Sequence, residues 1–197
     1  MNEGVTQSVS SQSPGTGVPG LWLFPLTWGF AEATLFFIVP DVFLTWVALQ
    51  GIRRGFKACG WALGGALLGG ATMWLWGRGD AGSATEALDH VPAISPLMIA
   101  SVRDMLASVG LTEVFFGPLF GTPYKVYAVQ AGSLGMPLIG FLIVSVPARL
   151  IRFIVLTLLS GAISGWIGDR LSISSKRAIL TILWVSFYGW YFSIMPN

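Results

Sequence analysis

The sequence predicts an all-α integral membrane protein, and composition and long apolar runs are the observations behind this prediction. Of the 197 residues, 54% are hydrophobic and only 10% are charged, and the mean hydropathy is +0.72. A soluble domain is about a quarter charged. The net charge of +2 is small and scattered, so nucleic acid is not an expected partner. The single cysteine, Cys59, excludes an intramolecular disulfide.

The first apolar run, Leu21–Gln50, is interrupted and carries two acids, Glu32 and Asp41. It is longer than the roughly 20 residues that a straight span needs. Pro25 and Pro40 interrupt it, and a proline inside a helix removes one hydrogen bond and clashes with the preceding turn. We therefore expect a helix that enters the membrane, breaks, and continues or turns back. Broken backbone at membrane depth is tolerated only where protein or a water-filled cavity covers it.

A second interrupted run, Leu111–Gly132, contains prolines, glycines and the charged Lys125. Each interrupted run is followed by a more regular apolar segment, Trp61–Gly77 in the first half and Pro137–Gly168 in the second. Paired interrupted segments in two halves of a chain indicate a transport site near the midplane of the membrane. The residues expected to break the two segments are Pro40, Pro118, Gly121 and Pro123.

The remaining elements complete the expected membrane domain. The glycine pairs Gly64–Gly65 and Gly69–Gly70 should let a neighbouring helix approach closely. A short amphipathic helix is expected from Ser95, as its cap, to Gly110. A last span is expected over Ala178–Met195. Short basic loops should be cytoplasmic and the acidic connection 78–104 outside. The basic residues concerned are Arg53, Arg54, Lys57, Arg170, Lys176 and Arg177.

Ionisable side chains within apolar segments are the candidate functional residues. A charge at the bilayer centre costs at least about 2.5–3.5 kcal/mol, and such groups usually pair with each other and mark a substrate or ion path. Asp41 follows Pro40 at the start of a helical half, where the helix dipole offsets only up to about 1 kcal/mol. A basic partner or water is therefore required. The predicted substrate- or ion-binding residues are Glu32, Asp41, Lys125, Arg149 and Arg152.

Two alternatives without a binding role remain open for these charges. They can be fixed ion pairs that only hold helices together, although buried pairs stabilise poorly compared with apolar packing. Arg149 alone can also extend its side chain to the membrane interface. The tryptophan and phenylalanine stripes are interpreted as lipid-facing or packing residues.

Three features resemble the DedA family, also called the SNARE-associated Golgi or VTT-domain membrane proteins. They are the Pro-acid element in EATLFFIVPDVFL, the PYK segment in VFFGPLFGTPYKVYAVQAGSLGMPLIGF, and the A-G-x-x-x-M-P-x-x-x-F run from Ala131 to Phe141. The resemblance makes residues 21–168 a DedA/VTT-like membrane domain. It implies spanning helices that flank two opposed re-entrant helical hairpins, and it implies lipid translocation. Bacterial members are linked to the return of undecaprenyl phosphate, and eukaryotic members to phospholipid scrambling.

The resemblance also implies roles for particular residues. The family's two functional acids map onto Glu32 and Asp41. The family carries two arginines around a proline in the second hairpin, but here Pro118 falls about where the first would be and Lys125 remains for the second. The pair Arg149 and Arg152 can supply the missing positive charge, so the chain looks like a divergent branch.

Outside the membrane domain, residues 1–20 are rich in Ser, Gly and Pro and are expected to form a disordered tail. They do not have the basic start of a signal peptide. Residues 169–197 are expected to form a basic loop and a C-terminal transmembrane helix. The expected location is the bacterial inner membrane.

The expected function is translocation of a membrane lipid, a phospholipid or a polyprenyl phosphate, with proton coupling as a hypothesis. Arginine grips a phosphate bidentately and lysine binds it as a point charge. The alternatives are an ion-coupled carrier of a small solute and a non-transporting assembly protein, and oligomers are compatible with each. An enzyme is not expected, because the one histidine, His90, lies in a polar connection. No metal or other cofactor is expected.

Overall fold

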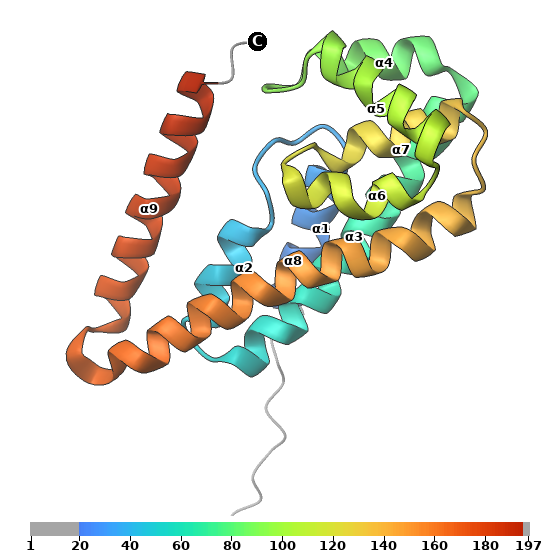
Figure 1. The fold of residues 1–197 in the computed structure, drawn as a ribbon. Helices are drawn as coiled ribbons and strands as arrows, with labels where there is room; N and C mark the ends of the chain where they lie inside the picture. Colours follow the sequence, from blue (N-terminus) through green and yellow to red (C-terminus); the bar gives the residue numbers. More distant parts are fainter. Residues whose placement is uncertain (1–19, 195–197) are drawn as a thin grey trace, which may run out of the picture.

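The computed structural model describes residues 20–194, and these residues form helices and connections with no strand among them (Figure 1). The predicted all-α class is therefore confirmed for this part of the chain. Apart from Gly20, the expected tail lies outside the described residues. The elements are α1 (Gly20–Ala33), α2 (Asp41–Ala48), α3 (Ile52–Gly79), α4 (Ala81–Asp89), α5 (Pro96–Val109), α6 (Thr112–Phe116), the 3₁₀ helix η1 (Gly117–Phe120), α7 (Tyr124–Ser133), α8 (Leu138–Ile167), the 3₁₀ turn η2 (Gly168–Arg170) and α9 (Ile173–Ile194).

Helix α3 is the central element, because α1, α2, α7 and α8 all pack against it. Its buried face consists mostly of glycine and alanine. A Cβ atom on Gly65 would collide with the backbone carbonyl of Leu26 in α1, and one on Gly69 would also meet the α1 backbone. Gly70 lies against an aromatic ring of α7. The predicted close approach is confirmed at these three glycines, whereas Gly64 faces open space.

The first interrupted run breaks once rather than twice. Helix α1 ends at Ala33, and α2 begins at Asp41 with Pro40 as its N-cap residue. The prediction of a break at Pro40 is confirmed. The prediction of an interruption at Pro25 is wrong, since α1 continues through this residue. Pro25 lies near the start of α1, so its missing N–H leaves only one early carbonyl without a helical partner.

The second interrupted run breaks between η1 and α7. Gly121 ends η1 with a φ of 101°, a left-handed conformation that favours glycine. Pro123 is the N-cap residue of α7 in an extended conformation. Pro118 lies within η1, where the chain changes from α-helix to 3₁₀ helix. Three of the predicted breakers, Pro40, Gly121 and Pro123, thus mark chain breaks, and Pro118 marks a tightening of the helix.

Two described helices, α3 and α8, are long and apolar enough to cross a membrane. Their most apolar stretches have mean hydropathies of 1.2 and 2.1. Helix α8 starts directly after Pro137 and continues through Pro147 to Ile167, as the apolar segment predicted. Arg53 and Arg54 were expected in a loop, but they lie in the first turn of α3 because arginine is a good helix former.

Helices α4 and α5 lie at one end of the molecule, against α7 (Figure 1). The predicted helix α5 is confirmed, with the Ser95 hydroxyl accepting a bond from the Met98 N–H at 3.3 Å and Gly110 at the end. Helix α4 was not predicted. It is capped by Asp80, whose carboxylate accepts a hydrogen bond from the Ser83 N–H at 3.0 Å. The bonds from Ser83 hold the pKa of Asp80 below its ordinary value.

Candidate functional site

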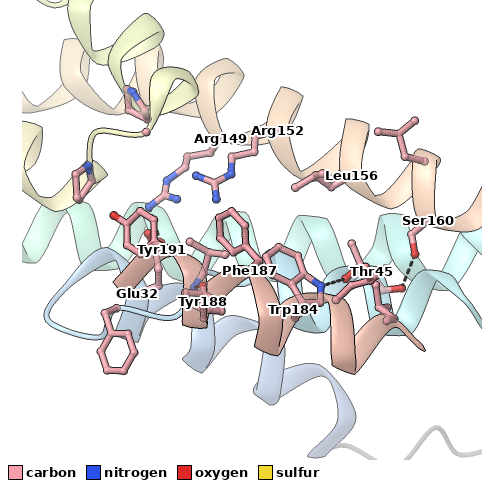
Figure 2. Close-up of a pocket in the computed structure, with 18 of the residues that line it drawn as sticks. Glu32, Thr45, Arg149, Arg152, Leu156, Ser160, Trp184, Phe187, Tyr188 and Tyr191 are labelled. Carbon is pink, nitrogen blue, oxygen red and sulfur yellow. Dashed lines mark hydrogen bonds and ion pairs between the residues drawn. The ribbon is translucent and has the colours of Figure 1, made fainter. Parts of the chain in front are cut away.

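Two ion pairs join α8 to the two sides of the first chain break. A guanidinium nitrogen of Arg149 lies 2.6 Å from a carboxylate oxygen of Glu32, in the last turn of α1. A guanidinium nitrogen of Arg152 lies 2.6 Å from a carboxylate oxygen of Asp41, the first residue of α2. Residues three apart lie on one face of a helix, so α8 presents both arginines to the same region. Figure 2 shows the two guanidinium groups side by side.

Burial differs between the two pairs. The side chains of Arg149 and Glu32 are 2% and 7% exposed, while those of Arg152 and Asp41 are 29% and 0% exposed. The Arg149 guanidinium also lies over the ring of Tyr124, 4.3 Å from its centroid. Arg149 therefore does not extend to the surface of the protein, and the alternative of a snorkelling side chain is wrong. Arg152 is the arginine that a molecule approaching from outside can reach.

Lys125 connects the two chain breaks. It is the second residue of α7, just after the second break, and its Nζ donates a hydrogen bond to the carbonyl of Phe36 at 2.6 Å. Phe36 lies in the first break, between α1 and α2. Within residues 20–194 no carboxylate lies within ion-pair distance of Lys125. All five predicted site residues thus lie in one region, and we refer to Glu32, Asp41, Lys125, Arg149 and Arg152 as the charged centre.

The charged centre keeps hydrogen-bonding capacity that the described part of the chain does not use. A guanidinium nitrogen of Arg152 lies 2.6 Å from one Asp41 oxygen, and the other Asp41 oxygen is buried without a hydrogen-bond partner. The Nε of Arg149 is also buried without one. Most buried polar groups in proteins are hydrogen-bonded, so such exceptions need an explanation.

The helix dipoles act in opposite directions on the two acids. Asp41 lies at the N-terminus of α2, where the helix dipole favours a negative charge. Glu32 lies near the C-terminus of α1, where the dipole opposes it. Glu32 therefore depends more strongly on its arginine than Asp41 does.

A cavity of about 640 Å³ extends from the charged centre along α8 and between α8 and α9. Glu32, Lys125, Arg149 and Arg152 line it at one end, and so do the breakers Pro118, Gly121 and Pro123. The remaining walls are mostly apolar. The chain therefore places fixed charges at the end of a long apolar space.

The aromatic residues of α9 are part of this site, whereas their pattern predicted only packing or lipid-facing side chains. The Trp184 Nε1 donates a hydrogen bond to the Thr45 hydroxyl in α2 at 3.1 Å. The Tyr188 hydroxyl accepts one from the Val39 N–H in the first break at 3.0 Å. Figure 2 shows the rings of Trp184 and Phe187 between α9 and α8. The helical spacing of Trp184, Phe187, Tyr188 and Tyr191 is the signal that would have identified this face.

The site residues do not form a metal centre. Among residues 20–194, no group of three or more histidine, cysteine, aspartate or glutamate side chains is placed to hold a metal ion. Comparison of the chain with protein-family models, with curated proteins and with solved structures found no match.

Proposed function

We propose that this chain is a membrane transporter that moves an anionic lipid across the bilayer, and that it is a divergent member of the DedA family. The observation that carries the proposal is the charged centre, in which two ion pairs and Lys125 lie at the end of an apolar cavity where two chain breaks meet. Buried charges in a membrane segment usually mark a substrate or ion path.

In this proposal α3 and α8 span the membrane, and the α1–α2 and α6–α7 segments are re-entrant hairpins. The hydrogen bond from Lys125 to Phe36 supports this arrangement, because it joins the two breaks directly. The irregular backbone at both breaks then lies at membrane depth, where surrounding protein and the cavity cover it. The proposed location is the bacterial inner membrane.

The headgroup step is an exchange of partners. A phosphate that reaches the charged centre competes with Asp41 for Arg152, the partly exposed arginine, and then with Glu32 for Arg149. Arginine binds phosphate through two parallel N–H bonds, so each exchange replaces one charge-assisted contact with another. A carboxylate that loses its arginine is left buried and uncompensated, and proton uptake would neutralise it. Proton coupling follows from this exchange as a hypothesis.

The apolar walls favour a lipid over a small polar solute, since a solute without a hydrocarbon part gains nothing from them. A non-transporting assembly protein would need the ion pairs only to join α1, α2 and α8. His90 is exposed at the end of α4 and does not line the cavity, and no enzymatic role is proposed.

The test is reconstitution of the purified protein in liposomes, with fluorescent phosphatidic acid, polyprenyl phosphate and zwitterionic phosphatidylcholine as substrates. We expect protein-dependent movement of the anionic lipids between leaflets and slower movement of phosphatidylcholine. Arg152→Gln should reduce this movement, whereas Arg53→Gln, at an exposed residue in the first turn of α3, should not. An imposed pH gradient that leaves the rate unchanged would remove proton coupling. Movement no faster than in protein-free liposomes would overturn the proposal.

A further inference from the structure

The space between α8 and α9 is long enough to hold one hydrocarbon chain. The cavity is lined by α8 residues from Arg149 to Ile167, a length of about 27 Å at 1.5 Å per residue. The roughly 30 Å hydrocarbon core of a bilayer is filled by two acyl chains end to end, so the cavity is long enough for one acyl chain. Past the charged centre, apolar side chains of α8 and α9 face each other across it, namely Leu156, Leu159, Ile163, Ile179, Leu183 and Phe187.

Helix α9 is held to the rest of the protein by few contacts. No described residue of α9 is buried, and Figure 1 shows this helix standing apart from α4–α7. Its hydrogen bonds run from Trp184 to Thr45, from Val39 to Tyr188, and from the Lys176 Nζ to the Ser164 carbonyl at 2.9 Å. A helix attached by polar contacts at its aromatic face and at its base forms a wall that can separate from α8 without breaking a packed core.

The charges of the charged centre indicate which headgroup the hydrocarbon chain should carry. Three cations, Lys125, Arg149 and Arg152, face two carboxylates, Glu32 and Asp41, so the charged centre has a formal excess of one positive charge. Within the charged centre, Lys125 has no carboxylate partner among the described residues, and it lines the cavity. Lys176 lines the cavity near the other end of α8, where its Nζ donates a hydrogen bond to the Ser164 carbonyl. One anionic group attached to a hydrocarbon chain complements both the charge and the apolar walls.

We propose that one acyl chain of an anionic lipid binds between α8 and α9, with its headgroup at Arg152 and Lys125 and its tail pointing toward Ile167. Helix α9 is the wall that moves to admit the chain from the side. This inference rests on the proposed function, because it assigns the tail of the lipid whose headgroup the charged centre handles.

The test compares two labelled variants of α8, one with a fluorescent probe inside the proposed site and one with the probe on the neighbouring residue outside it. Leu159 lines the cavity, and the adjacent Leu158 is exposed but does not line it. Both are replaced by cysteine in a Cys59→Ser background, which removes the one native thiol, and are labelled with bimane. The purified full chain in detergent is titrated with lysophosphatidic acid that carries a dibrominated stearoyl chain. Lysophosphatidylcholine with the same chain is the control for headgroup charge.

We expect saturable quenching of the Leu159→Cys label and only weak, non-saturating quenching of the Leu158→Cys label. The phosphatidylcholine analogue should need a several-fold higher concentration. If Leu159→Cys fails to fold, the cavity residue Ile163 and its neighbour Ala162 provide a second pair. Equal quenching at both positions of a pair, or none at either because α9 or a second copy of the chain fills the space, would overturn the inference.

The outcomes also separate this inference from the transport proposal. Saturable quenching at Leu159→Cys without lipid movement in liposomes would support the tail site and overturn transport. Lipid movement without position-specific quenching would overturn the tail site and leave transport supported.

Discussion

Removing one member of the Glu32–Arg149 pair should destabilise the protein far more than removing both. Arg149→Met leaves the Glu32 carboxylate in a position where its side chain is only 7% exposed. Breaking a buried ion pair from one side costs about 3–5 kcal/mol, because the remaining charge is uncompensated. Glu32→Gln should have a similar cost, since the Arg149 side chain is 2% exposed. The double variant removes both charges and should be close to wild type in stability, because an apolar or neutral replacement of a whole pair is often neutral.

The single cysteine provides the assay. Cys59 is 1% exposed, so a thiol-reactive dye labels it only when the protein unfolds. A loss of 1 kcal/mol lowers the melting temperature of a chain of this size by about 2–4 °C, so each single variant should melt about 6–20 °C lower than wild type. The double variant should melt within a few degrees of wild type. Single variants that melt like wild type would show that the pair is not buried, and a double variant as unstable as the summed singles would show that the two charges are not coupled.

Three further predictions concern helix packing, α9 and α4. Gly65→Ala should destabilise the protein by about 1–3 kcal/mol, because the new Cβ meets the α1 backbone. Gly64→Ala should leave the melting temperature unchanged in the same assay, because Gly64 faces open space. Equal effects of the two substitutions would contradict this packing. Trp184→Phe removes a hydrogen bond that contributes about 0.5–1.5 kcal/mol, so amide hydrogen exchange in α9 should become faster. Trp190→Phe, at a residue that is 62% exposed, should leave the exchange rate unchanged. Unchanged exchange in both variants would contradict the attachment of α9. The pKa of Asp80 is lowered in the folded protein, so its cap contributes its full stabilisation of α4 above the ordinary pKa of 3.8. This stabilisation is lost as pH falls through the lower pKa of the folded state. Hydrogen exchange at the start of α4 should therefore rise on acidification in wild type and not in Asp80→Asn, beyond the intrinsic effect of pH, and an identical rise in both would refute the capping account.

Local signals predicted much of the fold. Ser95 and Gly110 bound α5 as predicted, because capping depends on a few neighbouring backbone groups. Pro40 and Pro123 directly precede helices, because a proline inside a helix removes a hydrogen bond and clashes with the preceding turn. Helix α4 was missed because its nine residues bury only Ala84 and Leu88, too few to give a clear period.

The residues of the charged centre could be predicted, but their partners could not. A buried charge in an apolar run is visible in the sequence, whereas its partner depends on how distant segments pack. Lys125, Arg149 and Arg152 were all candidates for the two acids. The structure pairs the acids with the arginines and gives Lys125 the carbonyl of Phe36, an acceptor that side-chain patterns do not reveal.

The most direct test of the central claim is the rate of lipid movement in liposomes that contain the Glu32→Gln/Arg149→Met double variant, compared with wild type at equal amounts of folded protein. If the buried pair belongs to the transport site, the double variant should keep its stability and lose movement of fluorescent phosphatidic acid. If the variant folds normally and moves the lipid at the wild-type rate, the pair only holds helices together and the charged centre is not the site of transport.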